Sequence, residues 1–246
     1  MLTRLRQRLA DDRGFTLTEL LLASTIGVVV CGATLSLVEI SLKTQNDAAA
    51  RVTSVQDGRG VMNDVARIIR SQAPCVGNPA SVALVVAKDD TMTINTAIGG
   101  DTSTATETSS GGVRYQPLQQ RVLTFNASAM TLTEQVYNGV GSSPNATTFP
   151  TLTRTRIMGN RLRLIGSTAF FTYYAYTASA PYTPTVQLTP GAGGLSAADR
   201  ARVARIDVNF AVRSRDADST KDTRYSERLS TRIADPDDPT NWSSCT

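Results

Sequence analysis

The pattern of apolar and polar positions begins with a long apolar segment, residues 15–38, in which Glu19 is the only charged residue. As an α-helix this segment is about 36 Å long, enough to cross a hydrocarbon core of about 30 Å. Arginines cluster on the side that precedes the segment. Because positive flanks stay in the cytoplasm, we expect a single-pass helix retained in the cytoplasmic (inner) membrane, with a cytoplasmic N-terminus and an extracytoplasmic body.

The helical pattern continues beyond the membrane segment. Apolar residues recur at three-and-four spacing over residues 42–69, which is typical of an amphipathic helix, and no proline precedes Pro74. The pattern predicts one helix over about residues 15–72 whose second half docks on the chain's own domain. Gly58 and Gly60 each weaken this helix by ~1 kcal/mol relative to alanine and could allow a bend.

After Pro74 the pattern changes to short β segments separated by polar turns. It predicts a long N-terminal helix packed on a C-terminal antiparallel β-sheet domain, which is an α+β fold. A helical turn capped by Ser196 is expected near the C-terminal strand pair. The predicted strands form two hairpins (81–87 with 91–98, 121–127 with 130–137), a strand pair around Gly159-Asn160, the strands 169–178 and 185–189, and a closing pair (203–214 with 223–234).

The segment "RGFTLTELLLAS" (13–24) joins a basic leader, a glycine, an aromatic residue and a glutamate to the start of the apolar run. It resembles the processing signal of type IV pilins and type II secretion pseudopilins. In that family a membrane-embedded aspartyl peptidase cuts after the glycine and methylates the new N-terminus. The resemblance implies a cut between Gly14 and Phe15, and a role in assembly for Glu19.

The resemblance also implies an order of segments along the chain. These are a leader peptide (1–14), a membrane-spanning assembly helix (15–38), its amphipathic continuation (39–73) and an extracytoplasmic β-rich domain (74–246). The lack of a proline in the first helix and the large body favour a minor subunit, similar to PilW-type minor pilins or J-type minor pseudopilins.

The expected function is therefore that of a minor type IV pilin, a structural subunit that primes or caps a pilus filament. The expected partners are the prepilin peptidase, which is also the N-methyltransferase, other pilin or pseudopilin subunits and the membrane. One alternative is a minor pseudopilin of a type II secretion system. Another, from a different class, is a signal-anchored extracytoplasmic binding protein or enzyme.

A cation that could pair with the Glu19 carboxylate at the start of the helix exists only after cleavage. Before the cut the nitrogen of Phe15 is a neutral amide, and a carboxylate at mid-membrane costs about 2.5–3.5 kcal/mol. The cut exposes an α-ammonium with a reference pKa of about 7.7–8.0. The resemblance implies that this ammonium belongs to a neighbouring subunit. The alternative is a glutamate near the interface that snorkels or takes up a proton.

The amino-acid composition limits the catalytic and metal-binding chemistry that the chain can perform. The chain has 246 residues, a net charge of +4 and no histidine. This excludes histidine-dependent nucleophile activation and histidine metal ligation, and we expect no enzymatic activity and no cofactor. Of the three cysteines, Cys31 lies in the apolar segment, and Cys75 and Cys245 are candidates for a disulfide outside the cytoplasm.

Two further groups of residues are weaker candidates. The predicted strand pair around Gly159 would place four arginines on one face as a polyanion patch, but without interleaved aromatic residues; a solvated face or a subunit contact is favoured over DNA. A loop with three aspartates begins like a calcium site but lacks its glycine and closing glutamate, so a plain polar loop is favoured. These candidates are Arg154, Arg156, Arg161 and Arg163, and Asp216, Asp218 and Asp222.

Overall fold

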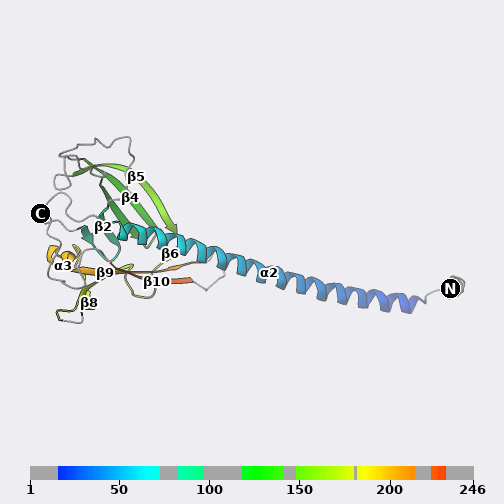
Figure 1. Ribbon diagram of the computed structural model, residues 1–246. Helices are drawn as coiled ribbons and strands as arrows, with labels where there is room; N and C mark the ends of the chain where they lie inside the picture. Colours follow the sequence, from blue (N-terminus) through cyan, green and yellow to red (C-terminus); the bar gives the residue numbers. More distant parts are fainter. Residues whose placement is uncertain are drawn as a thin grey trace, which may run out of the picture. The chain divides into compact units, whose positions relative to one another are not determined.

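The computed structural model describes residues 16–72, 83–96, 118–140, 148–179, 182–213 and 223–230. The chain divides into two compact units, Met1–Ala49 and Ala50–Thr246. Helix α2 (Leu17–Arg70) contributes its first part to one unit and its last part to the other (Figure 1).

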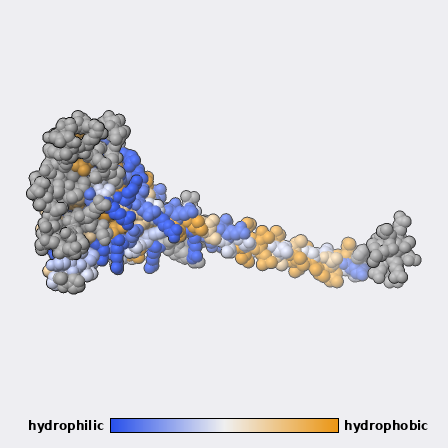
Figure 2. All heavy atoms as spheres, viewed as in Figure 1, coloured by the Kyte–Doolittle hydropathy of each residue, from blue (hydrophilic) through white to orange (hydrophobic). Residues whose placement is uncertain are grey.

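Helix α2 confirms the prediction of one long helix. It has 54 residues, about 81 Å of helix, and it continues without interruption through Gly58 and Gly60. Every described residue up to Ala49 is exposed, including large apolar side chains such as Leu17 at 75% and Val28 at 72%. Figure 2 shows these apolar residues along the first part of the helix. A helix that is apolar on all sides needs lipid or protein around it.

The first sheet is an antiparallel meander in which each strand pairs with the next along the chain. Both predicted hairpins of this region are confirmed. Burial alternates along β3, as expected for a strand with one face on the core. The strands are β1 (Leu84–Ala87), β2 (Thr91–Thr96), β3 (Gln119–Asn126), β4 (Thr131–Val140) and β5 (Thr148–Asn160).

The second sheet has the order β10-β9-β7-β8, with β6 paired to β9 beyond the end of β7. The predicted closing strand pair is confirmed, and so is the short helix α3 (Ala197–Ala201), whose N-cap Ser196 accepts a hydrogen bond from the amide of Asp199. The strands are β6 (Leu162–Arg163), β7 (Phe171–Tyr176), β8 (Pro184–Leu188), β9 (Val203–Val212) and β10 (Thr223–Ser230).

Within the second unit, the last part of α2 packs between the two sheets (Figure 1). Its buried stripe from Val61 to Ile69 enters one continuous core with apolar residues of both sheets. Aromatic rings link the layers: Phe125 of β3 stacks on Phe170 at 4.6 Å, and Phe170 stacks on Phe210 of β9 at 5.5 Å. The α+β fold is therefore confirmed, with the helix as the middle layer of the domain.

The predicted strand pair around Gly159 is wrong. The first of its two strands is part of β5, which pairs with β4, whereas the second is β6, which pairs with β9 in the other sheet. Between them Arg161 adopts a positive φ of 61°, which is rare for a residue other than glycine. The chain therefore leaves one sheet and enters the other at Arg161, and it makes no hairpin there.

Candidate functional site

The start of α2 holds Glu19 in a capping box. The Glu19 carboxylate accepts hydrogen bonds from the amide of Thr16 at 3.0 Å and from its hydroxyl at 2.9 Å, and the Thr16 hydroxyl accepts one from the amide of Glu19 at 3.3 Å. This motif was not predicted from the sequence. Its signal is nevertheless present there, as a threonine followed three residues later by a glutamate. Gly14 and Phe15, the residues of the expected cut, lie outside the described residues.

The first part of α2 is a candidate membrane span. Among the described residues, α2 is the one helix that is long and apolar enough to cross a bilayer, and the apolar part of it is fully exposed. Apart from Glu19, the first charged residue of the described helix is Glu39. By length and composition, the helix can serve as a single-pass anchor.

The second part of α2 is fixed in the domain by a close contact with β10. The ring of Tyr225 lies against Gly58, where a Cβ atom would come within 2.1 Å of the ring. The Tyr225 hydroxyl donates a hydrogen bond to the carbonyl of Val55 at 2.7 Å, and burial raises the pKa of this phenol. Gly58 is therefore required for the close approach of helix and strand.

A charged network ties the first sheet to the same helix. Glu134 of β4 is fully buried and bonds to Arg121 of β3 and Arg156 of β5. Arg156 also pairs with Asp64 of α2 at 3.0 Å. Burial raises the pKa of Glu134, but the hydrogen bonds from Arg156 and Arg121 outweigh it, so the pKa lies below its usual range. Arg156 thus connects a buried carboxylate with the helix surface.

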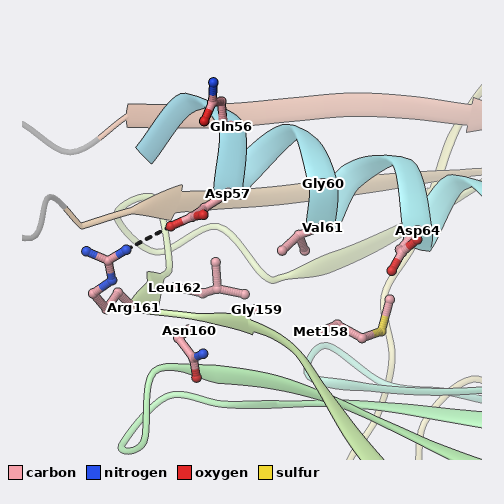
Figure 3. Close-up of a pocket in the computed structure, with 10 residues that line it drawn as sticks. All are labelled: Gln56, Asp57, Gly60, Val61, Asp64, Met158, Gly159, Asn160, Arg161 and Leu162. Atoms are coloured by element: carbon pink, nitrogen blue, oxygen red, sulfur yellow. Dashed lines mark hydrogen bonds and ion pairs between the residues drawn. The ribbon is translucent and has the colours of Figure 1, made fainter. Parts of the chain in front are cut away.

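A groove of about 660 Å³ lies between α2 and the end of β5 (Figure 3). At one end Asp57 accepts a hydrogen bond from Arg161 at 2.8 Å, and at the other end Asp64 lies above the side chain of Met158. The two acids that line the groove are both paired with arginines. The carboxylates of the groove are therefore already neutralised by arginines.

The four arginines predicted to share one face are divided between three places. Arg154 and Arg156 lie on β5, Arg161 lies in the crossing segment and Arg163 lies on β6 of the other sheet. Arg154 is 3.5 Å from Glu134, and Arg156 and Arg161 form the ion pairs described above. The four arginines therefore do not share one face, because these strands belong to different sheets.

The remaining candidate residues are the cysteines and the three aspartates of the predicted polar loop. Cys31 is an exposed free thiol on α2, whereas Cys75 and Cys245 lie outside the described residues, as do Asp216, Asp218 and Asp222. Within the part of the chain that the structure describes, no group of three or more acidic or cysteine side chains is arranged to hold a metal ion.

Comparison with known proteins gives no relative for this chain. No protein-family model, no curated protein and no solved structure matches it. A function for this chain is therefore inferred from the leader motif, the long helix and its contacts.

Proposed function

We propose that this chain is a minor type IV pilin, a non-enzymatic subunit that is anchored in the cytoplasmic membrane and then built into a pilus. The proposal rests on two features that occur together in one segment of the chain. A glycine-aromatic-glutamate leader motif leads directly into an exposed apolar helix, and the same helix continues into the core of a β-rich domain.

The exposed apolar part of α2 explains how one helix serves two environments. Lipid chains and apolar faces of neighbouring helices are equally suitable surroundings for a helix that is apolar on all sides. The helix of such a subunit can be surrounded first by lipid in the membrane and then by the helices of other subunits in the filament. In this proposal the body lies outside the cytoplasm, in agreement with the arginines that precede the helix.

Glu19 gives the proposal its mechanism. Its carboxylate lies in the first turn of α2, where the helix dipole favours a negative charge, and it is bound to Thr16. Cleavage after Gly14 creates an ammonium at Phe15, next to Thr16 in the chain. We expect the carboxylate to pair with such an ammonium on a neighbouring subunit, which would set the register between the two helices.

Glu19→Gln separates this role from simple helix capping. Glutamine can replace glutamate in a capping box, but it has no charge to offer an ammonium. We expect the variant to be processed like the wild type and to fail to enter assemblies, with at least a tenfold loss of cross-linked complexes in membranes. Site-specific cross-linking through the α2 helix in cells that express the partner pilins measures this loss.

The matched control is Glu39→Gln, which removes the same charge from an exposed position of the same helix. It should enter assemblies at the wild-type level. Normal assembly of Glu19→Gln would show that the carboxylate acts only as a cap, and equal losses in both variants would show that the charge pair is not specific to Glu19.

A further inference from the structure

The two outer strands of the first sheet differ in what lies beside them. At β1 the carbonyl of Ala87 accepts a hydrogen bond from the amide of Leu195, in the segment that leads into α3. At the other end of the sheet, β5 pairs with β4 on one side only (Figure 1). Among the described residues, no backbone hydrogen bond reaches the free side of β5 between Pro150 and Met158. We call this side the open edge.

The open edge is long and exposed. Strand β5 has 13 residues, and every residue from Pro150 to Thr155 is exposed. Pro150 has no N–H to donate, and Gly159 is buried against Val61 of α2. A partner strand can therefore pair over residues 151–157, about 23 Å of backbone. Such a row of unpaired N–H and C=O groups is a template for a further strand.

Arginines outnumber carboxylates beside the open edge. Four arginines share two carboxylates there, which leaves a surplus of two positive charges within the group. On the strand itself, Arg154 is 3.5 Å from Glu134, and its side chain is 55% exposed. An acidic group that approaches the open edge can therefore pair with a cation that is only weakly engaged. The residues that these ion pairs connect are Arg67, Arg121, Arg154 and Arg156, with Asp64 and Glu134.

The same arginines make a second copy of this chain a poor partner. Antiparallel pairing of two β5 strands centred on Arg154 places the two Arg154 side chains opposite each other. Pairing centred on Thr155 places Arg154 opposite Arg156 of the other copy. Like charges that lie directly opposite each other destabilise a strand pair. The charges therefore favour a different strand, one that carries acidic residues.

We propose that the open edge binds an extended acidic segment of another protein, which adds a sixth strand to the first sheet. Main-chain hydrogen bonds supply affinity, and acidic residues at alternate positions pair with Arg154 and Arg156 and set the register. On the opposite face of β5, Leu152 and Ile157 are 45% and 58% exposed and can contact apolar side chains of the same segment. This interaction goes beyond the proposed role in pilus assembly and does not depend on it.

The test is fluorescence anisotropy with the detergent-solubilised full chain and a labelled peptide. The peptide consists of nine threonine and valine residues with glutamates at its fourth and sixth positions, which lie on one face of a strand. We expect it to bind about tenfold more tightly than the same peptide with lysines at these positions. Arg154→Gln should weaken its binding about three- to fivefold, and Arg154→Lys should restore most of the affinity.

The matched control variant is Arg59→Gln, which removes an exposed arginine from α2 and should leave the affinity within about 1.5-fold of the wild type. A control peptide, N-methylated at its three central residues, keeps both glutamates but lacks main-chain donors. We expect it to bind at least about tenfold more weakly. Amide hydrogen exchange of residues 151–157 should slow when the acidic peptide is bound, and exchange of β1 should not change.

Equal binding of the methylated or the lysine peptide would overturn the proposal, because it would show that strand pairing or charge is not involved. The same conclusion follows from wild-type affinity of a folded Arg154→Gln variant, from unchanged hydrogen exchange in β5, or from no binding of the acidic peptide at about 1 mM in low salt. Self-association of the chain that the peptide reverses would assign the open edge to a second copy instead.

Discussion

Glu134→Gln is expected to lower the free energy of unfolding by about 3–5 kcal/mol, because removal of one partner from a buried ion pair leaves an uncompensated charge. That charge is Arg121, whose side chain is only 5% exposed beside a fully buried carboxylate. Arg156 would also lose the partner that connects it to the sheet. Urea unfolding of the detergent-solubilised chain, followed by the β signal in circular dichroism, measures the effect.

The matched control is Glu227→Gln, because Glu227 forms an ion pair at 3.7 Å with both side chains well exposed. Exposed pairs contribute about 0–1 kcal/mol, so this variant should unfold close to the wild type. A loss below about 1 kcal/mol in Glu134→Gln would show that the buried network is not a main source of stability.

The same carboxylate predicts the direction of acid sensitivity. The folded-state pKa of Glu134 lies below its usual range, so its contribution is complete above the unfolded pKa of about 4.3 and is lost as the pH falls through the folded pKa. We expect the wild type to lose stability below about pH 4. Glu134→Gln lacks this contribution at every pH, so its stability should change less over the same acid range.

Gly58→Ala is the second large effect. A Cβ atom at this position would meet two ring carbons of Tyr225 at 2.1 and 2.3 Å and its hydroxyl oxygen at 2.7 Å, so the strand or the ring must move. Overpacking of this kind costs about 1–3 kcal/mol and can cost more, and here the hydrogen bond from Tyr225 to Val55 is at risk as well. The expected result is a clear fall in the midpoint of thermal unfolding.

Gly60→Ala provides the control for Gly58→Ala, because a Cβ atom at Gly60 meets nothing within 4 Å. It should stabilise the helix by up to about 1 kcal/mol. The cost of Gly58→Ala should also disappear in a Tyr225→Ala background, where the clash is absent. An equal cost in that background would assign the effect to the helix alone.

Local patterns predicted the elements well. Helix α2 and the three hairpins or strand pairs that are confirmed each follow from periodicity, turn residues and the absence of proline over a short range. The prediction of a strand pair around Gly159 was wrong because strand pairing depends on more than local pattern. Gly159-Asn160 has the composition of a turn, but the positive φ lies at Arg161, and pairing of Leu162 with Val212 depends on a distant strand. Alternation alone does not say which sheet a strand joins.

The candidate sites show the same limit. The Thr16–Glu19 capping box is a local motif and is readable from the sequence. The Glu134 network is not, because Arg121 and Arg156 reach it from two other strands and Asp64 from the helix.

The intact mass of the chain, extracted from membranes of cells that contain a prepilin peptidase, tests whether this chain is processed and used as a pilin. We expect a mature chain that begins at Phe15 and carries one N-terminal methyl group, and we expect Gly14→Ala to leave the heavier precursor. A wild-type chain that still begins at Met1, or a Gly14→Ala variant that matures normally, would contradict this proposal.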